Sequence, residues 1–446
     1  MNSTKAIADK DGASFTHVSV FLFLSLCTGD TKRVVQICLF LFIALCPIQD
    51  FMLQGTPLRS LGASPAIFPL CALVIVEGGQ RLFSTKTRAS LAPMICFVYV
   101  ILTAVYGLFV FGFSSHGENL LWKGTTSLIS LGAILFAITL DYGKYPVVRT
   151  AIYVAFTLVV LGFLFGNSNP LGLPALTENG VLHFTPLPDE RPRGLASEPS
   201  QFSITAIVIG LLSIHLTRSR SGKILLFLLT LGLLILSGSK GGVLTLFLCA
   251  IILCILKWHS TWYQVVGSLF VLFPLGIILI WLIPDLFPEE SFAISGTIPT
   301  RFSMITCALM TVRHHPLGVG LTGFLPAVAR YLPGAMSAVE SIFPFPLYFG
   351  EVSEYLTSAD MVSTKTFFFD QLMRFGIPFA LFFFVFITGL IKRLAAKGRM
   401  ILLTAIMACT IAVITYQPGT GNFAIPIVFG VALLEAGNGT NPLRCE

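Results

Sequence analysis

The sequence predicts an all-α polytopic membrane protein with about twelve transmembrane helices. Hydrophobic residues make up 55% of the 446 residues and charged residues only 11%, whereas about a quarter of a soluble domain is charged. Apolar runs of 17 or more residues recur along the chain, and each is long enough to cross a hydrocarbon core of roughly 30 Å. Alternation with a period of two residues is absent from the sequence, so the spans are predicted to be helices.

The spans are expected in twelve apolar segments, and the segment 15–29 is expected to be an interfacial or partial helix. The run Phe15–Thr28 is short and lacks a small-x-small pattern, so no cleavable signal peptide is expected. The expected spans lie near 34–53, 62–78, 91–113, 119–140, 147–166, 201–217, 222–238, 241–257, 263–283, 366–390, 400–416 and 421–436.

Basic residues in alternate loops predict how the chain is oriented. If Lys32 and Arg33 are cytoplasmic, the other basic loops also fall inside, and the basic-poor loops 114–119 and 417–422 fall outside. Both termini are then cytoplasmic. The net charge of +7 is explained by this topology, so no nucleic-acid partner is expected. Both large polar segments, 167–200 and 284–365, then fall outside.

This topology divides the chain into alternating bundles and loops, without an internal repeat or a soluble domain. The ten cysteines form no CxxC pair and are expected to be packing residues. The predicted divisions are the cytoplasmic segment 1–33, helices 1–5 in 34–166, the outer loop 167–200, helices 6–9 in 201–283, the outer loop 284–365, helices 10–12 in 366–436, and the cytoplasmic tail 437–446.

The first outer loop, 167–200, ends in a motif suited to binding an anion. It reads Arg191-Pro-Arg-Gly-Leu-Ala-Ser-Glu198-Pro-Ser, and the second proline stands where a helix should begin. Ser197 is the expected N-cap, which puts Glu198 at the positive end of the helix dipole. Arg191 and Arg193 face a phosphate or sugar hydroxyl, or else they pair with the preceding carboxylates in a solvated loop.

The second outer loop, 284–365, is expected to contain short amphipathic helices, because 301–313 has apolar residues at helical spacing. Arg301 and Arg313 would lie about 18 Å apart on a continuous helix. They therefore bind different parts of a ligand, or only one of them binds it. His315 is expected to be a helix cap or an acid/base group. Adjacent His residues do not share a helix face, so a zinc site is disfavoured.

A third polar element, Ser237-Gly-Ser-Lys-Gly-Gly242, lies between two spans. Its glycines favour a tight helical hairpin that brings Lys240 to the membrane surface near the outer loops. An interfacial lysine is also common without any function. The carboxylates of 351–360 precede Lys365 and are expected to form a solvated rim.

These elements, in this order, resemble the O-antigen polymerase/O-antigen ligase superfamily of bacterial polysaccharide assembly. The resemblance is carried by Arg-x-Arg-Gly-Leu-Ala-Ser-Glu-Pro-Ser at 191–200, Ser-Gly-Ser-Lys-Gly-Gly at 237–242, and Arg301 followed by His315-Pro-Leu-Gly-Val-Gly-Leu-Thr-Gly-Phe324. It covers most of the second half of the chain. The first half is similar only in its spans.

The resemblance implies a GT-C-like membrane glycosyltransferase on the outer face of the cytoplasmic membrane. It would use undecaprenyl-pyrophosphate-linked oligosaccharides and need no metal or other cofactor. Arginines of the two outer loops hold the pyrophosphate in the family, and the matching positions here are Arg191 or Arg193, and Arg301. The product would be an O-antigen of lipopolysaccharide or an exopolysaccharide. A chain-length regulator and a flippase are the expected partners.

Two departures from the family pattern bear on the reaction. Family ligases use a histidine late in the second loop, and the corresponding segment 358–366 has none. The Glu-Pro-Ser sequence is more similar to the polymerases, so polymerase is favoured over a ligase that moves polymer to a lipid A core or a protein. Lys240 replaces a more usual arginine, which keeps the charge and loses the bidentate fork.

The predicted mechanism uses the arginines to stabilise the leaving pyrophosphate, with Lys240 or Lys365 as helpers. Glu198 is the first candidate for the general base and His315 the second. A transporter or flippase for lipid-linked sugars is an alternative, although such proteins usually have ionisable residues at mid-membrane. A non-enzymatic scaffold is another alternative.

Overall fold

The computed structural model of the chain describes most of the sequence, and for a few helical residues it describes the backbone alone. The described residues are 31–51, 64–78, 91–115, 117–166, 182, 192–258, 291–343, 347–357, 362–417 and 422–437. The expected interfacial segment 15–29 and the expected span 263–283 lie outside these ranges.

Helices make up nearly all of the described structure, apart from one short hairpin of strands. In chain order the elements are α2 (Thr31–Leu45), α3 (Ile67–Leu73), the π-helical η3 (Val74–Gly78), α5 (Leu91–Phe111), β1 (Ser114–Ser115), β2 (Glu118–Asn119), α6 (Leu120–Thr139), α7 (Val147–Gly166), α8 (Pro199–Leu216), α9 (Arg220–Leu236), α10 (Lys240–Trp258), α12 (Ser291–His314), α13 (Gly320–Ile342), α14 (Gly350–Glu354), α15 (Phe367–Ala396), α16 (Met400–Thr415) and α17 (Ala424–Gly437).

The helices confirm an all-α membrane protein. Each expected span within the described ranges overlaps a helix. By length and composition, α6, α7, α8 and α15 are suited to crossing a membrane. Shorter apolar helices include α16 and α17. The total of twelve crossings stays a prediction.

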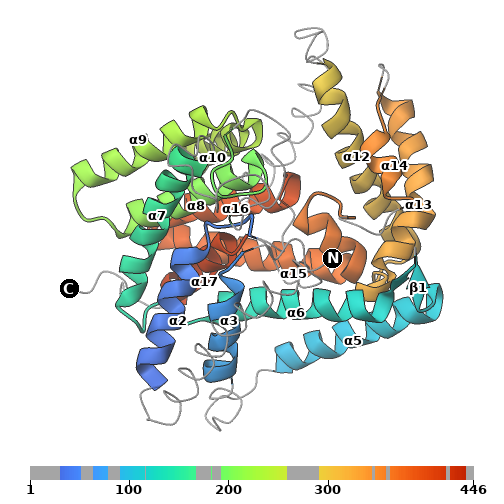
Figure 1. Cartoon of the computed structure of the whole chain (residues 1–446), viewed down its shortest axis with the longest axis horizontal. Coiled ribbons are helices and arrows are strands. Elements are labelled where there is room, and N and C mark those ends of the chain that lie inside the picture. Colours follow the sequence, from blue (N-terminus) through green and yellow to red (C-terminus); the bar gives the residue numbers. More distant parts are fainter. Residues whose placement is uncertain are drawn as a thin grey trace, which may run out of the picture.

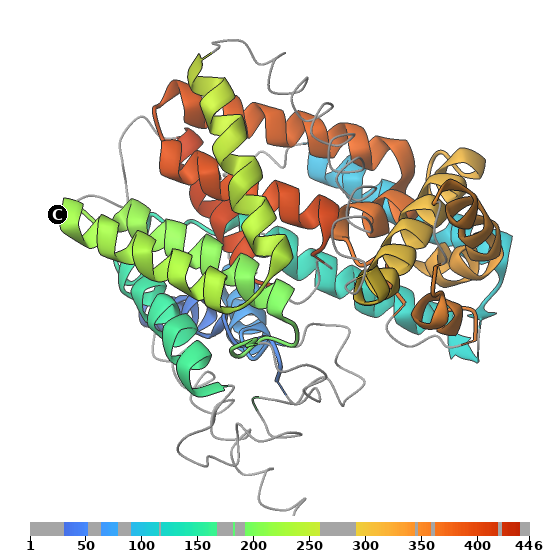
Figure 2. The same cartoon turned by 90° about the horizontal axis from the view of Figure 1, so that it is seen from above.

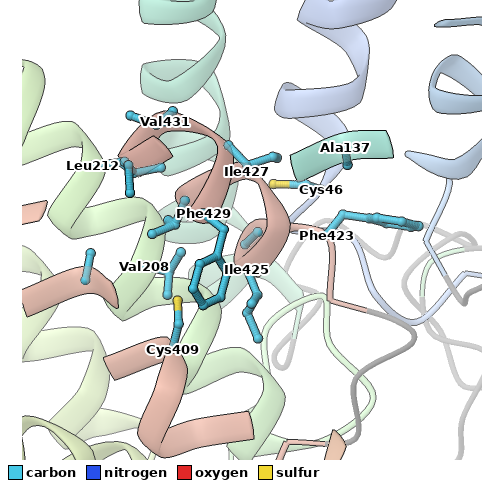
Figure 3. Packing of buried hydrophobic residues seen from close by; sticks show 14 of the residues in the cluster. Cys46, Ala137, Val208, Leu212, Cys409, Phe423, Ile425, Ile427, Phe429 and Val431 are labelled. Atoms are coloured by element: carbon cyan, nitrogen blue, oxygen red, sulfur yellow. The ribbon is translucent and has the colours of Figure 1, made fainter. Parts of the chain in front are cut away.

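Helix α8 lies at the centre of the bundle, packed against α7, α9, α10, α16 and α17. A helix that is apolar on all sides must be buried on all sides, and Ile204, Ile207 and Val208 of α8 are fully buried. Figure 3 shows α17 side chains such as Phe429 packing near Val208. The centre of the bundle therefore supports the N-terminal end of α8.

Helices α12, α13 and α14 gather at one end of the molecule, beside the β1–β2 hairpin (Figure 1). The perpendicular view gives the same arrangement (Figure 2). Helix α13 packs along α5 and α6, the two helices that lead into and out of the hairpin. Helices α12, α13 and α14 belong to the predicted outer loop 284–365. They therefore lie at the same end of the bundle as the β1–β2 hairpin.

The turn between α12 and α13 is joined to the bundle at a break in α15. Gly376 has φ +62°, which interrupts the helix and leaves backbone groups for other partners. The amide of Ile377 donates to the carbonyl of Pro316 (2.8 Å), and the amide of Val319 donates to the carbonyl of Met373 (3.0 Å). The hydroxyl oxygen of Tyr99 lies 2.7 Å from the carbonyl oxygens of both Leu317 and Phe375, and it can donate its one proton to either. The turn and the break therefore satisfy each other's hydrogen bonds.

Glycine is needed in this turn for two separate reasons. Gly318 has φ +83°, which strains residues with a Cβ atom. A Cβ at Gly318 would also collide with the carbonyl of Arg374. Gly112 has a similar φ of +84°, but nothing lies within 4 Å of the position of its Cβ.

We expect Gly318→Ala to lower the stability of the protein more than Gly112→Ala. The Gly112 variant meets only the backbone strain, about 1–2 kcal/mol, whereas the Gly318 variant must also separate the turn from α15. Thermal unfolding of both variants in one detergent compares them. Equal losses of stability would contradict the close packing of this turn.

Candidate functional site

Arg301 lies where several elements distant in the sequence converge. It is in α12, and its Nη1 donates to the carbonyl of Thr415 (3.0 Å) in the last turn of α16. The last carbonyls of a helix lack intrahelical donors and carry a partial negative charge, so a guanidinium is favoured there. Within the described residues, this is the hydrogen bond that Arg301 makes. Its remaining N–H donors are available to a ligand.

Two carboxylates act electrostatically on Arg301 from different elements. Burial lowers the pKa of the Arg301 guanidinium, while the charges of Glu198 and Glu351 raise it. An arginine stays protonated under such influences. A half-buried cation is thus held near two acids without a direct ion pair to either in the described structure.

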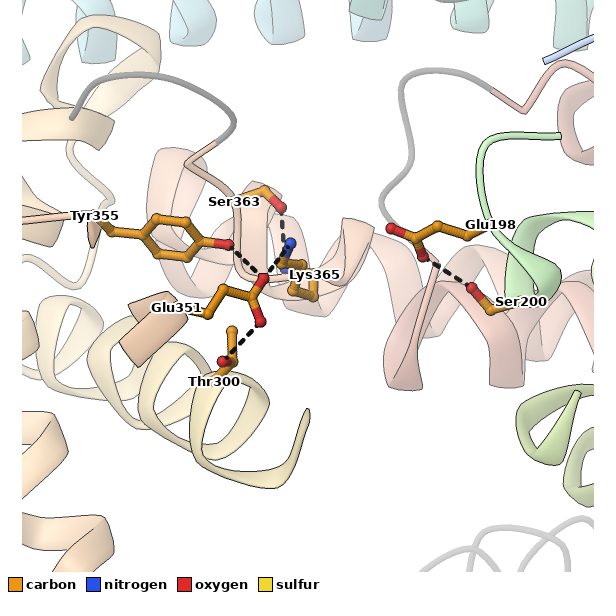
Figure 4. Close-up of polar contacts among 7 residues, drawn as sticks. All are labelled: Glu198, Ser200, Thr300, Glu351, Tyr355, Ser363 and Lys365. Atoms are coloured by element: carbon orange, nitrogen blue, oxygen red, sulfur yellow. Dashed lines mark hydrogen bonds and ion pairs between the residues drawn. The ribbon is translucent and has the colours of Figure 1, made fainter. Parts of the chain in front are cut away.

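Glu198 is the N-cap residue of α8, in extended conformation (φ −142°, ψ 150°), and Pro199 follows in the first turn. The prediction that Ser197 is the N-cap is wrong, because the hydroxyl of Ser197 donates to Gln201 (2.9 Å) instead. The Glu198 side chain makes no capping bond. It is exposed and accepts a hydrogen bond from Ser200 at 3.1 Å (Figure 4). Its second oxygen is available to a substrate proton.

Lys365 and Glu351 form the other half of the site. The Lys365 Nζ lies 2.8 Å from Oε1 of Glu351. The same carboxylate accepts hydrogen bonds from Thr300 (3.0 Å) and from Tyr355 (3.2 Å), as Figure 4 shows. We expected Glu351 to belong to a solvated rim, and its side chain is 46% exposed. It is also the counterion of Lys365, and its contacts connect α12, α14 and the segment before α15.

The backbone of Lys365 is held in an unusual conformation. Its φ of +58° is the one positive value at a non-glycine residue in the described ranges, and such values cost energy that surrounding contacts must offset. Its amide donates to the Ser363 hydroxyl (3.1 Å). The adjacent Thr364 donates its amide proton to Asp370 (2.7 Å). These bonds direct the Lys365 ammonium toward Glu351.

Both members of this pair are charged at neutral pH. Burial raises the pKa of Glu351, but Lys365, Thr300 and Tyr355 outweigh it and hold the pKa below its ordinary value. Burial lowers the pKa of Lys365, while Tyr355 and Glu351 raise it to a net value above the ordinary one. Glu351 and Lys365 therefore both keep their charges across the physiological pH range.

The hairpin between α9 and α10 packs beside the Arg301 site. The Ser239 hydroxyl donates to Ser203 of α8 (2.9 Å), and a Cβ on Gly241 would lie 3.4 Å from the Tyr416 ring. Tyr416 follows the Thr415 carbonyl that binds Arg301, and its hydroxyl lies 3.1 Å from Thr245 of α10. Lys240 begins α10 at this point, but its side chain lies outside the described structure.

Arg193 is enclosed by protein instead of facing an open site. Its side chain is 2% exposed, and its Nη2 lies 3.3 Å from a buried oxygen of Asp50. Its Nη1 donates to the carbonyl of Ser197 (2.9 Å). Arg193 thereby connects the segment after α2 with the start of α8 and supports Glu198. Arg191 lies outside the described residues, and anion binding by either arginine stays a prediction.

His315 lies far from Arg301. The two residues are fourteen positions apart, about 21 Å along a helix. The His315 Nδ1 lies 3.0 Å from the Tyr106 hydroxyl, and its Nε2 lies 3.0 Å from the Tyr331 hydroxyl. Burial, with the charges of Arg330 and His314, lowers the pKa of His315. A neutral imidazole donates at one nitrogen and accepts at the other, so His315 connects α5 to α13.

The arrangement around Arg301 combines a cation for an anionic group with a carboxylate able to accept a proton. Sequence reasoning predicted Arg301, Glu198 and Lys365 but did not assign a role to Glu351, Tyr355 or Tyr416. An acidic residue in a polar loop has no distinctive pattern, and a tyrosine at the end of a span is typical of membrane interfaces. In the described ranges, no three His, Cys, Asp or Glu side chains cluster as a metal site requires.

We expect Asp50→Asn to destabilise the protein by about 3–5 kcal/mol, because it removes the negative charge that lies 3.3 Å from Nη2 of the buried Arg193. The exposed Arg220 offers a matched control, and Arg220→Gln should be nearly neutral. Thermal and denaturant unfolding in detergent measure both changes. If Arg193→Met kept the stability of the wild type but lost catalysis, Arg193 would be a substrate ligand instead.

The stabilising effect of the Glu351–Lys365 pair should be constant between the ordinary pKa values of the two groups, 4.5 and 10.5. It should depend on pH only below and above that window. A carboxylate with a lowered pKa stabilises above its ordinary value of 4.5 and loses this effect as the pH falls through its folded pKa. A lysine with a raised pKa stabilises below 10.5 and loses this effect as the pH rises through its folded pKa.

The difference in melting temperature between wild type and Glu351→Gln should therefore be constant between these limits and shrink in acid. Glu354 is exposed on the same helix and has no side-chain partner in the described structure, so Glu354→Gln is the control. A difference that changed steadily across neutral pH would contradict the assignment.

Comparison with known proteins gives one informative similarity. No protein-family model matches the chain. The chain is 26% identical, over 368 residues, to an uncharacterized 49.5 kDa protein in the cps region of Klebsiella pneumoniae. The similarity covers 81% of this chain and 82% of that protein, so it extends over the bundle and the outer segments together. The chain is thus an all-α membrane protein with a relative in a cps region.

Proposed function

We propose that this protein is a polysaccharide polymerase that joins undecaprenyl-pyrophosphate-linked repeat units on the outer face of the cytoplasmic membrane. The proposal depends most on Arg301, a half-buried cation near the exposed carboxylate of Glu198 at the N-terminus of α8. The cps-region relative supports a role in polysaccharide biosynthesis, because cps denotes capsular polysaccharide. The resemblance in the outer loops supports the same class of reaction.

Arg301 is suited to binding the pyrophosphate of the donor, the growing chain. Negative charge builds up on that group as it leaves, and a fixed cation stabilises the charge without reorganisation. The Thr415 carbonyl holds one edge of the guanidinium, and the free donors suit bidentate binding of a phosphate. Lys365, whose charge is balanced by Glu351, lies near the same part of α12 and is positioned to help hold the pyrophosphate.

Glu198 is assigned as the general base. The acceptor hydroxyl oxygen forms a bond to the anomeric carbon while the bond from that carbon to the pyrophosphate oxygen breaks. The electron pair of the broken bond leaves with undecaprenyl pyrophosphate, and Glu198 takes the hydroxyl proton. The anomeric carbon is inverted in this single displacement. Among the described residues, Glu198 has one side-chain hydrogen bond, from Ser200, so it can accept a second one from the acceptor.

The ligase reaction is the closest alternative, since it would use the same donor group at the same site. The absence of a histidine in the segment 358–366 favours the polymerase. A lipid-linked sugar transporter would bind the same pyrophosphate but form no glycosidic bond. The products therefore distinguish the three functions.

We expect purified protein in nanodiscs, given the lipid-linked repeat unit of its host, to make a ladder of longer lipid-linked chains in the presence of EDTA. Arg301→Ala should lower the rate by about 10²–10³-fold, and Glu198→Gln by about 10²–10⁴-fold. The exposed Arg393 at the far end of α15 offers a control, and Arg393→Gln should keep the wild-type rate.

Other outcomes would identify the alternatives. Transfer to an added lipid A core or protein, without a ladder, would identify a ligase. Movement of the lipid-linked unit across liposomes, with no product of any kind, would identify a transporter. An unchanged ladder in Arg301→Ala would contradict the assigned site.

A further inference from the structure

A second group of basic side chains lies at the C-terminal end of α12, beyond Arg301 in the middle of that helix. Arg313 and His314 end α12, and Arg330 of α13 shares the Tyr331 ring with His314. All three are exposed. Within the described structure none of them has a carboxylate partner. We call Arg313, His314 and Arg330 the basic patch. Its charge is available to an anionic ligand.

Aromatic rings hold the basic patch in place. The His314 ring is stacked on Tyr331, with an interplanar angle of 8° and centroids 5.3 Å apart. The Arg330 guanidinium lies 5.7 Å from the centre of the Tyr331 ring. The Tyr331 hydroxyl is in turn hydrogen-bonded to His315, which also contacts Tyr106 of α5. His314 and Arg330 of the basic patch are therefore preorganised, which lowers the entropic cost of binding an anion there.

An exposed apolar stripe of α5 leads to the basic patch. Leu102, Val105 and Phe109 are 62%, 53% and 91% exposed, and they share one face of the helix with Tyr106. In a membrane protein such a surface faces lipid. Tyr106, within this stripe, contacts His315, which follows the basic residues at the end of α12. The basic patch thus lies beside a surface suited to a lipid chain.

The proposed reaction requires two pyrophosphates at separate places. The pyrophosphate of the donor is the leaving group, so it must lie at the reacting centre with Arg301. The acceptor reacts through a hydroxyl of its sugar chain, and its own pyrophosphate is attached at the other end of the repeat unit. It must therefore bind one repeat unit away from the reacting centre.

The distance along α12 suits this requirement. Arg313 lies twelve residues after Arg301, which is about 18 Å on a helix. An oligosaccharide of a few sugar residues spans such a distance. Arg313 lies at the C-terminal end of α12, next to the contact of His315 with Tyr106 of α5, whereas Arg301 lies in the middle of α12 and contacts α16.

We propose that the basic patch binds the pyrophosphate of the acceptor, the polyprenyl-pyrophosphate-linked repeat unit. This inference rests on the proposed polymerase function. The acceptor then lies along α12 with its lipid chain on the α5 stripe and its reactive hydroxyl near Glu198. The separation of Arg301 from the basic patch selects acceptors of one repeat unit in length.

A binding experiment tests the basic patch independently of catalysis. Arg301→Ala protein in zwitterionic nanodiscs lacks the donor site and should still bind polyprenyl pyrophosphate. Adding Arg313→Gln and Arg330→Gln should weaken this binding by about tenfold or more, and adding Arg393→Gln should not. Inorganic pyrophosphate should bind more weakly, because it lacks the chain that contacts α5. Equal binding of inorganic pyrophosphate, or no effect of the patch substitutions, would overturn the proposal.

A kinetic experiment separates this proposal from the proposed function. With a labelled donor chain, the wild type should use the lipid-linked repeat unit at a lower KM than the free repeat-unit oligosaccharide. Arg313→Gln with Arg330→Gln should raise the KM for the lipid-linked acceptor about tenfold and leave transfer to the free oligosaccharide unchanged. Equal losses with both acceptors would overturn the acceptor site. If the wild type used neither acceptor, the polymerase function would be wrong, and the binding result would still decide whether the basic patch holds a lipid pyrophosphate.

Discussion

The hydrogen bonds between the break in α15 and the turn after α12 determine where the outer helices lie. A helix interrupted in a membrane protein must satisfy the freed backbone groups within the protein. At Gly376 those groups meet the backbone of 316–319, and Tyr99 completes the set. This junction anchors the C-terminal end of α12 to α5 and α15. Because the helix continues without a proline from Arg301 to His314, the junction also helps to place Arg301, in the middle of α12, against the end of α16.

The arginines of the outer segments show how burial determines the role of a cation. Arg193 is fully enclosed with Asp50 and Ser197, and the carboxylate of Asp50 balances its charge within the protein. Arg301 is half-buried and, within the ranges that the structure describes, has one hydrogen bond, to a helix carbonyl, so its remaining donors can serve a ligand. Arg330 is exposed and lies against an aromatic ring. Desolvation strengthens the attraction of a cation for an anion, which favours Arg301 as the site of the chemical step.

Sequence reasoning predicted some parts of the candidate site well. The proline after Glu198 correctly indicated the start of α8, because proline suits the first turn of a helix. The sequence-based prediction placed the N-cap of α8 at Ser197, one residue too early, because the Ser197 hydroxyl bonds to Gln201 instead of to the backbone. The partners of Arg193 and Lys365 could not be predicted. Asp50 follows the first described helix, and Glu351 contacts Lys365 through a short helix whose orientation depends on α12.

The sequence by itself determined the helical membrane architecture, the approximate span positions and the polar elements that carry Arg301, Glu198 and Lys365. These follow from local properties: apolar length, the conformational preferences of proline and glycine, and the sequence positions of charges. The tertiary structure alone decided that Arg301 lies by Glu198 and Glu351, that Arg193 is enclosed, and that His315 connects α5 to α13 at the far end of α12. These facts depend on packing between helices that are distant in the sequence, and no local pattern encodes which charges such packing brings together.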